Sequence, residues 1–329
     1  MRSRYFSRSV RFLKSVTIAA LAAAALPAWA QYPSKPIHVV VTYLAGGSAD
    51  TLARIVAPKL AEAWGQPVIV ENRAGAAGNL GADLVAKAPP DGYTLMFTPP
   101  SPLGINWLLY KQMPFDPRTA FTPVSVLGAM PNILIVGPRV VAKDTGEFIA
   151  YAKAHPGKLN YGSQGVGSTP HLTGAMLALA AGIDIVHVPY KGFPPILTDL
   201  MGSRLDFAFL DSSNVLPRLK EGRVRALAVA SEKRFFALPD TPTLAEAGFP
   251  TMVSLTWMSF AGPAGMPAEI ARKWHEELQK IVKMPDVQAR FANLGFEAWA
   301  SSPEEMRQQM ENEMVHWGDV IKRTGARSD

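Results

Sequence analysis

A glycine-rich loop between a predicted strand and a predicted helix is the segment with the clearest chemical potential. It reads Gly162-Ser-Gln-Gly-Val-Gly167-Ser168-Thr169 and matches the phosphate-binding pattern G-x-x-x-x-G-K-[ST], except that Ser168 replaces the lysine. Such a turn directs unpaired backbone N–H groups and the positive end of the following helix toward an anion. Without the lysine, nucleoside triphosphate binding is disfavoured. His171, just beyond the loop, is interpreted as a helix-start residue with a local hydrogen bond.

A second loop of the same design follows the first predicted strand. It reads Ala45-Gly46-Gly47-Ser48 and has no basic residue beside it. If the two loops face each other across a cleft, they bind a carboxylate through backbone amides, hydroxyl groups and water. The alternative is that both loops are tight turns capped by Ser48 and Thr169.

Other reaction chemistry finds little support in the spacing of the polar residues. The six histidines are scattered and the chain has no cysteine, so we expect no metal site and no cofactor. No G-x-S-x-G nucleophile elbow surrounds Ser48 or Ser163, so we predict no catalytic residue and no enzymatic activity. Gly75, Gly78 and Gly81 lack the spacing of a dinucleotide fingerprint, and they are interpreted as a turn with close helix packing.

The first 30 residues have the three parts of a secretory signal peptide. Five basic residues lie within the first fourteen, an apolar run covers 16–26, and Ala28-Trp29-Ala30 forms a cleavage motif. Because the basic region has no paired arginines, we expect export by the general secretory route to the periplasm. The absence of cysteine means that neither a disulfide nor a lipid-bearing cysteine is expected.

The composition is that of a folded protein, with 48% hydrophobic and 18% charged residues. The formal net charge of +6 falls to +1 when the five basic residues of the signal peptide are removed. Sequence-independent nucleic-acid binding needs a basic excess, so no nucleic-acid partner is expected. Beyond residue 30, no apolar run approaches the roughly 20 residues needed to cross a bilayer.

Apolar patterns predict strands that alternate with helices. The strands are expected at 36–43, 67–71, 93–98, 133–136, 159–162, 185–188, 206–210, 224–230 and 255–260. The helices are expected at 49–64, 80–88, 145–155, 172–181, 195–202, 213–221, 267–284, 286–294 and 303–324. Pro58 should kink or shorten the first helix, and Ser302, Pro303 and Glu305 form a capping box that starts the last one.

This alternation predicts an α/β fold in which each of two lobes is a mostly parallel sheet flanked by helices. Because the long C-terminal helices are expected to return to the first lobe, the chain should cross between lobes near 130 and 253. We therefore predict a cleaved signal peptide over 1–30, a first lobe of 31–130 plus 254–329, and a second lobe of 131–253.

Several segments resemble one family of bacterial transport proteins. They are YPSKPI, QPVIVENRAGAAGNLGA, KAPPDGYTL, FTPVS, HPGKLNYGSQGVGSTPHL, IVHVPYKG and LPDTPTLAEAG, and they occur in order along the chain from residue 32 to residue 248. They resemble the Bug (Bordetella uptake gene) family, the solute-binding components of tripartite tricarboxylate transporters. The resemblance implies a type II-like Venus-flytrap periplasmic binding protein. Such a protein closes on a small organic carboxylate and presents it to two integral-membrane subunits.

The resemblance also implies ligand contacts at the ends of several predicted strands. These contacts fall on Tyr43, Ala45, Gly46, Gly47, Ser48, Asp50, Thr98, Pro99, Ser163, Gly167, Ser168, Thr169, Tyr190 and Asp211. In the family, the carboxylate is held largely by backbone amides and ordered water, which agrees with the missing lysine. Asp211 would repel a carboxylate unless a donor or water intervenes or the ligand carries an ammonium group. Its alternative is a helix N-cap.

Two departures from the family pattern bear on the ligand. Leu44-Ala45 stands where the family usually has two prolines, and Phe193 stands where it usually has a small residue. Phe193, together with Trp107 and Trp257, is a candidate aromatic wall, and we include Phe193 and Trp257 among the ligand-binding residues. The sequence therefore predicts an aromatic or otherwise apolar carboxylate over citrate, the alternative being that each aromatic residue packs in a lobe core.

The leading hypothesis is thus a soluble, monomeric periplasmic protein that binds a small organic acid by hinge closure and delivers it to a transporter. One alternative is a ligand-dependent partner of a membrane sensor. The other is a periplasmic enzyme on the same scaffold.

Overall fold

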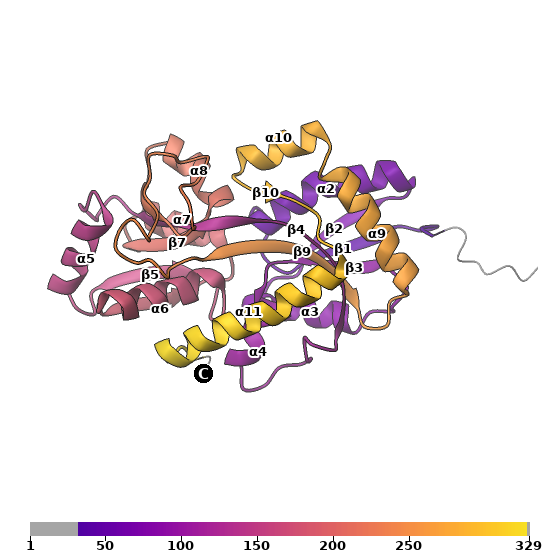
Figure 1. Ribbon diagram of the computed structural model, residues 1–329, viewed down its shortest axis with the longest axis horizontal. Helices are drawn as coiled ribbons and strands as arrows, with labels where there is room; N and C mark the ends of the chain where they lie inside the picture. The colour runs from indigo at the N-terminus through magenta and orange to yellow at the C-terminus, as the bar shows by residue number, and fades with distance from the viewer. Residues whose placement is uncertain (1–31, 328–329) are drawn as a thin grey trace, which may run out of the picture. The chain divides into compact units, whose positions relative to one another are not determined.

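Two long antiparallel strands, β4 (Phe121–Val136) and β9 (Leu255–Pro263), run through the middle of the sheet in the computed structural model, which describes residues 32–327. Residues 121–131 of β4 pair with β9, whereas residues 132–136 pair with β7 and β8. Figure 1 shows β4 and β9 extending between the two halves of the sheet. Because β4 contributes to both halves, these strands connect the two halves directly.

The remaining elements alternate along the chain. The other strands are β1 (Ile37–Val41), β2 (Val68–Asn72), β3 (Thr94–Thr98), β5 (Leu159–Ser163), β6 (Ile185–Pro189), β7 (Phe207–Asp211), β8 (Arg225–Val229) and β10 (Glu297–Ala298). The helices are α2 (Ser48–Trp64), α3 (Asn79–Ala86), α4 (Ile105–Leu109), α5 (Thr145–Ala154), α6 (Thr169–Ala181), α7 (Phe193–Met201), α8 (Ser212–Lys220), α9 (Ala268–Ile281), α10 (Pro285–Asn293) and α11 (Pro303–Thr324), with 3-10 turns η2 (Ala76–Gly78) and η3 (Ser101–Leu103).

The strand order is β2-β1-β3-β9-β4-β7-β5-β6, with β8 and β10 paired to β4. We call β1, β2, β3, β9, β10 and residues 121–131 of β4 the first half of the sheet, and β5 to β8 with residues 132–136 of β4 the second half. β1 pairs in parallel with β2 and β3, and β5 pairs in parallel with β6 and β7. A helix separates the strands of each consecutive parallel pair, as parallel pairing requires. The predicted α/β class is confirmed, and the antiparallel pairs are those made by β4 and β9.

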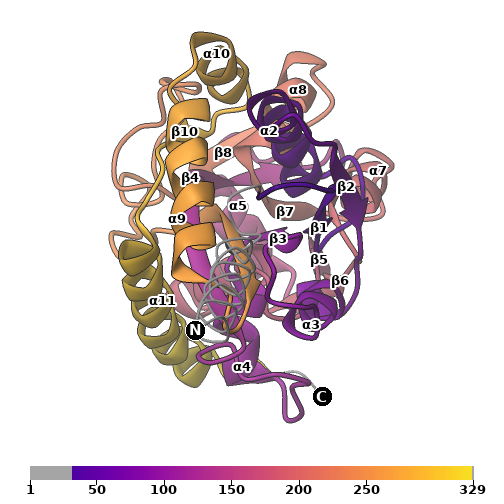
Figure 2. The ribbon, with the colours of Figure 1, turned by 90° about the vertical axis from the view of Figure 1, so that its right-hand side faces the viewer.

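Helices cover both sides of the strands, as Figure 2 shows for α9 and α11 on one side and α3 on the other. The helix α11 begins beside the first half of the sheet, where the backbone N–H of Ser301 donates to Val126. Further along, Trp317 and Val320 of α11 pack with Ile105 of α4 and Leu172 of α6. The C-terminal helix therefore contacts both halves.

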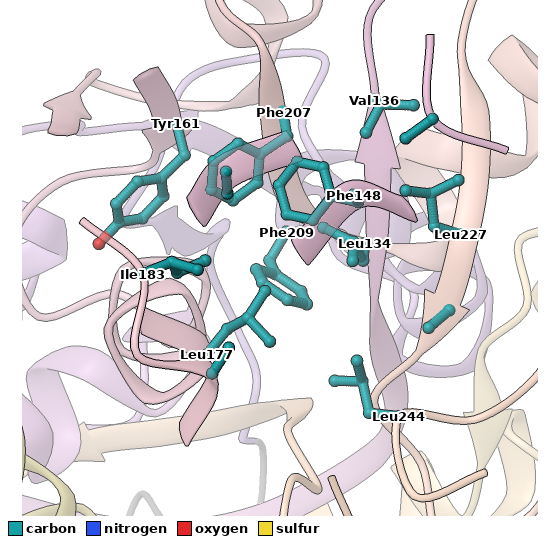
Figure 3. Close-up of a cluster of buried hydrophobic side chains, with 14 of the residues drawn as sticks. Leu134, Val136, Phe148, Tyr161, Leu177, Ile183, Phe207, Phe209, Leu227 and Leu244 are labelled. Carbon is teal, nitrogen blue, oxygen red and sulfur yellow. The ribbon is translucent and has the colours of Figure 1, made fainter. Parts of the chain in front are cut away.

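The second half of the sheet has a large aromatic core, drawn in Figure 3. Phe207 of β7 lies edge-on to Phe148 of α5, with 4.9 Å between ring centroids, and stacks on Tyr161 of β5 at 5.3 Å. Leu134 of β4 joins this core, while its neighbour Ile133 belongs to the core on the opposite face. A strand buried on both faces explains the continuous apolar run of residues 133–136.

Most of the predicted elements are present, with two differences. Asp144, Ser168, Asp211 and Ser302 each cap a helix through the side chain, and Ser302 forms the predicted capping box. The first difference is that α2 continues through Pro58 as a single helix. The second is that β4 starts at Phe121, well before the predicted residue 133.

The prediction for the first 30 residues, a signal peptide, falls outside the described residues. Within residues 32–327, no helix has the length and apolarity that a bilayer crossing requires. The change of β4 partners at Pro131 and Asn132 lies beside the first expected crossing point, and the backbone of Asn132 bonds to Ser254 near the second. The lobe boundaries themselves stay a prediction.

Two helical glycines offer a matched test of this packing. A Cβ atom on Gly174 of α6 would overlap the ring of Tyr161, whereas one on Gly318 of α11 would meet only Leu108 at 3.8 Å. Gly174→Ala should destabilise the protein by about 1–3 kcal/mol through overpacking. Gly318→Ala should stabilise it by about 0.5–1 kcal/mol through helix propensity. Chemical denaturation of both variants measures the difference, and equal stabilities would contradict the described packing.

Candidate functional site

The first glycine loop and the start of α7 meet around a small cavity. Tyr43, Leu44, Gly47, Ser48, Ala49, Pro99, Gln164, Gly192, Phe193 and Met258 line it. The cavity has a volume of about 10 Å³, which is the space that a single water molecule needs. None of these lining residues carries a charged side chain, and the N-termini of α2 and α7 both lie at the cavity.

A buried hydrogen bond joins the start of α2 to the end of β7. The Ser48 hydroxyl donates to Oδ2 of Asp211 at 2.7 Å, and both residues are buried. The other oxygen, Oδ1, accepts from the Ser213 hydroxyl and the Asn214 side-chain amide, each at 2.8 Å. Asp211 is also the N-cap of α8, so this alternative interpretation is confirmed. Burial raises the pKa of the carboxyl, and these hydrogen bonds oppose that effect.

Asp50 holds the first glycine loop in shape. Its Oδ2 accepts from the backbone N–H of Gly46 at 2.9 Å, and its Oδ1 accepts from Arg54 at 2.8 Å. Arg54 also donates to Asn72, whose amide donates to the backbone oxygen of Tyr43. This chain of bonds fixes the loop from the solvent side. Both carboxylate oxygens of Asp50 are thereby engaged with the protein.

A strained turn in the first half lies against the second glycine loop. Ala76 and Ala77 both have left-handed backbone conformations, with φ of 47° and 48°, which cost about 1–3 kcal/mol each unless the surroundings impose them. The carbonyl of Ala77 accepts from the Tyr43 hydroxyl at 2.9 Å and from the Asn106 amide at 3.0 Å. A Cβ on Gly165 would lie 3.5 Å from that of Ala77.

This turn belongs to the segment of Gly75, Gly78 and Gly81. Gly75 and Gly78 have positive φ, and a Cβ on Gly81 would lie 2.8 Å from a backbone oxygen. The interpretation as a turn with close helix packing is confirmed.

The second glycine loop uses its polar side chains within the protein. Ser168 caps α6 in place of the expected Thr169, whose hydroxyl bonds that of Thr256 on β9 at 2.8 Å. The hydroxyl of Tyr110 in the first half donates to the carbonyl of Val166 at 3.1 Å. A Cβ on Gly167, which has a φ of 91°, would overlap the Asn106 side chain. The loop therefore contacts the first half of the sheet through its backbone.

Two neighbouring histidines, with their rings tilted by 31°, contact this loop. The rings of His171 and His187 lie 4.1 Å apart, and Nε2 of His187 is 2.6 Å from the Ser163 hydroxyl. Nδ1 of His171 accepts from the backbone N–H of Gly167 at 3.2 Å, which confirms its interpretation as a helix-start residue with a local hydrogen bond. Burial and the neighbouring His187 lower the pKa of His171 to about 3, and burial lowers that of His187 to about 4.

The structure brings together some of the sequence-predicted site residues and directs others elsewhere. Tyr43, Gly47, Ser48, Pro99 and Phe193 line the cavity. The predicted residues that are not part of its lining are Ala45, Gly46, Asp50, Thr98, Ser163, Gly167, Ser168, Thr169, Tyr190, Asp211 and Trp257. Among these, the hydroxyl of Tyr190 donates to Oδ2 of Asp199 at 2.7 Å. The hydroxyl of Thr98 is hydrogen-bonded to the hydroxyl of Thr42 at 2.8 Å.

Five lining residues are absent from the predicted ligand contacts, namely Leu44, Ala49, Gln164, Gly192 and Met258. The first three lie within or beside the two predicted glycine loops. Gly192 carried a signal, because it directly precedes the proline-rich start of α7. Met258 carried none, since it reaches the cavity from the middle of β9. Nothing in its local sequence distinguishes it from a core residue.

The three aromatic residues of the proposed wall are separated in the structure. Phe193 lines the cavity and also packs in the core of the second half. Trp107 lies against Arg118, with 5.1 Å between the guanidinium and the ring centroid. Trp257 lines a different, larger cavity beneath α11. Of the three, Phe193 is therefore the one that the structure places at the small cavity.

Metal binding has no counterpart in this geometry. Across the described part of the chain, no three His, Cys, Asp or Glu residues gather in an arrangement that could hold a metal ion.

Residues 52–326 match the tripartite tricarboxylate transporter family receptor, TctC. The chain belongs to this family. It is 34% identical to the protein BugT of Bordetella pertussis over 297 residues, which are 90% of this chain and 91% of BugT. The resemblance to Bug proteins is thus confirmed, and the chain is a TctC-family solute-binding protein of the periplasmic type.

Solved structures of other proteins show the same fold. Rpa4515 of R. palustris, solved with adipate, has 35% identity and a TM-score of 0.88, and the match covers 90% of this chain and 99% of that one. MatC of Rhodopseudomonas palustris, solved with bound malate, has 32% identity and a TM-score of 0.84, covering 88% and 100%. The predicted two-lobed periplasmic binding protein fold is confirmed for this TctC-family member.

The buried histidines make the stability of this TctC-family protein depend on pH. In the unfolded chain both pKa values return to about 6.5, so below that pH the unfolded state binds protons that the folded state does not. The contribution of these two histidines to stability is therefore full above pH 6.5 and falls as the pH drops toward 4, by at most about 1.4 kcal/mol per pH unit for each histidine.

Urea denaturation between pH 7 and pH 5 measures this slope. His187→Gln should lower this slope by up to half, because it removes one of the two buried histidines. A slope that is identical in wild type and His187→Gln would show that this histidine pair does not control the effect.

Proposed function

We propose that this protein captures a small organic carboxylate between its two lobes in the periplasm and presents it to the membrane subunits of a tripartite tricarboxylate-type transporter. The observation that carries the proposal is the uncharged cavity at the N-termini of α2 and α7, lined from both halves of the sheet. Positive helix ends and free backbone N–H groups attract an anion without a basic side chain. The adipate and malate bound by the two neighbours named above are carboxylates of this class.

The small volume of the cavity supports a closed arrangement of the lobes. Contacts across it involve glycines on both sides, since a Cβ on Gly47 would lie 3.8 Å from Phe193 and one on Gly192 would lie 3.1 Å from Leu44. A ligand of several carbon atoms must then enter while the lobes are apart. Its contacts with both lobes would stabilise the closed state, which is a population shift.

We propose the lobes as 31–130 plus 254–329 and 131–253, with β4 and β9 as the hinge. The ligand contacts are proposed to come from the predicted residues that line the cavity, with Gln164, Gly192 and Met258 added. Asp50, Tyr190 and Asp211 are proposed to position the loops, because their polar side-chain atoms bond within the protein. The protein is proposed to act as a monomer after removal of residues 1–30, and without catalysis.

Thermal unfolding of residues 31–329 against a panel of acids tests the ligand class. Adipate, malate, citrate, benzoate and terephthalate form the panel, with their neutral amides as controls. A ligand at 100 times its dissociation constant should stabilise the protein by about 2.7 kcal/mol. A shift with acids and none with amides supports the proposal. No shift with any acid, or conversion of a bound acid into product, would contradict it.

Lobe closure is tested by a pair of glycine variants. Gly167→Ala adds a Cβ that overlaps Asn106 in the closed arrangement, so it should weaken acid binding at least about ten-fold. Gly182→Ala is the control, because Gly182 also has a positive φ but has nothing within 4 Å of its added Cβ. Isothermal titration calorimetry compares them. Equal affinities in the two variants would show that binding does not require this contact.

The preference for an aromatic or apolar acid over citrate is proposed to depend on Phe193. Phe193→Leu keeps an apolar side chain in the core but removes the ring. It should lower the affinity for benzoate or terephthalate at least about five-fold, with a smaller effect on adipate. The same calorimetry measures it. Tighter binding of citrate than of the aromatic acids by the wild-type protein would refute the preference.

Delivery to a transporter is separated from sensing by deleting the gene. Loss of uptake of the identified acid supports delivery. Loss of acid-induced gene expression with unchanged uptake would assign the protein to a sensor instead.

A further inference from the structure

A second and larger cavity lies beneath the C-terminal helix α11, away from the glycine loops. Its volume is about 570 Å³, within the range of pockets that hold small molecules. Strands β4 and β9 form one wall and α11 forms the other, and these elements are labelled in Figure 1. Three tryptophans line it, namely Trp257, Trp299 and Trp317, so we call it the tryptophan cavity.

The indole rings provide both the buried wall and the rim. Trp257 and Trp317 are 2% and 1% exposed, whereas Trp299 is 45% exposed. The Nε1 of Trp317 donates to Oε2 of Glu313 at 2.6 Å. The Nε1 of Trp257 also faces Glu313 but makes no hydrogen bond of normal geometry within the described residues. A buried indole N–H without a partner is uncommon and marks an incompletely satisfied polar site.

The charges around this cavity are acidic. Glu305 and Glu313 line it, together with His316, and neither lysine nor arginine is among its lining residues. Burial raises the pKa of Glu313, and the hydrogen bonds from Trp317 and Gln309, together with the nearby indole N–H of Trp257, oppose this by favouring the carboxylate. Burial lowers the pKa of His316, which favours its neutral form. Within the described part of the chain, Glu313 forms no ion pair.

Indole rings beside two glutamates, with no lysine or arginine in the lining, favour binding of a cation over binding of an anion. The face of an indole ring attracts an organic cation, and a carboxylate supplies its counter-charge. A carboxylate ligand would instead meet two acidic side chains with no basic partner. The tryptophan cavity is thus opposite in charge to the site proposed for the transported acid.

We propose that the tryptophan cavity is a second binding site, which takes a small organic ammonium ion with Glu313 as its counter-ion and Trp257 and Trp299 as its aromatic walls. This proposal does not depend on the carboxylate site, because the two cavities share no lining residue.

Isothermal titration calorimetry with benzyltrimethylammonium and phenethylammonium tests the proposal, with phenylacetate as an anionic probe of similar size. The wild-type protein should bind the two ammonium ions saturably, and at least about ten times more tightly than it binds phenylacetate at this site. Because phenylacetate could enter the other site, each titration is repeated with the identified acid present at saturation, or with adipate if none is identified. No saturable binding of either ammonium ion, or equal binding of phenylacetate under saturation, would overturn the proposal.

Variants then locate the site. Glu313→Gln keeps the size and hydrogen-bonding capacity of the side chain but removes its charge, and it should weaken ammonium binding at least about ten-fold. Glu311→Gln is the matched control, since Glu311 is an exposed residue of the same helix outside the lining, and it should bind as the wild type does. Trp299→Ala changes a largely exposed ring and should weaken binding at least about five-fold. Unchanged affinity in both Glu313→Gln and Trp299→Ala would overturn the assignment, and thermal unfolding confirms that each variant folds.

Discussion

The hydrogen bond from Ser48 to Asp211 joins the two halves of this protein through two fully or nearly fully buried side chains. A buried carboxylate is costly unless donors surround it, and here one of those donors comes from the first residue of α2. The positions of the first glycine loop and of the end of β7 therefore depend on each other. Other contacts between the halves include the hydrogen bond from the Tyr110 hydroxyl to the carbonyl of Val166 and the close approach of Gly165 to Ala77.

The long strands β4 and β9 determine which loops can meet. Because β4 pairs first with β9 and then with β7 and β8, it aligns the ends of β1 and β7 across the sheet. The sequence pattern was sufficient to predict residues 133–136, where the strand is buried on both faces and continuously apolar. It was insufficient for residues 121–132, since Pro123, Gly128 and Pro131 are typical of loops and the register shifts there. Tertiary pairing forms the strand despite these residues.

Local sequence also predicted the backbone of the candidate site better than its side chains. The glycine turns, the helix starts and the cap at Asp211 depend on neighbours within a few residues, and they are present. The expected caps Ser48 and Thr169 were wrong by one residue, since Gly47 is the N-cap of α2, without a side-chain bond, and Ser168 caps α6. Thr169 bonds to Thr256 on β9, and Tyr190 bonds to Asp199 on α7. Trp257 lines the cavity beneath the helix α11. Which cavity a side chain enters is decided by such distant partners, and a single sequence does not contain that information.

The division of roles around the small cavity has an evolutionary consequence. Polar groups that shape the loops, such as those of Asp50 and Asp211, bond to the protein itself, whereas several lining side chains are small or apolar. Backbone amides are present whatever residue occupies a position, so the attraction for an acid that we propose would persist while Phe193, Met258 or Gln164 changes. Under the proposed function, a lineage carrying this scaffold would come to accept a different acid through few substitutions, without changing the turns that bring the two halves together.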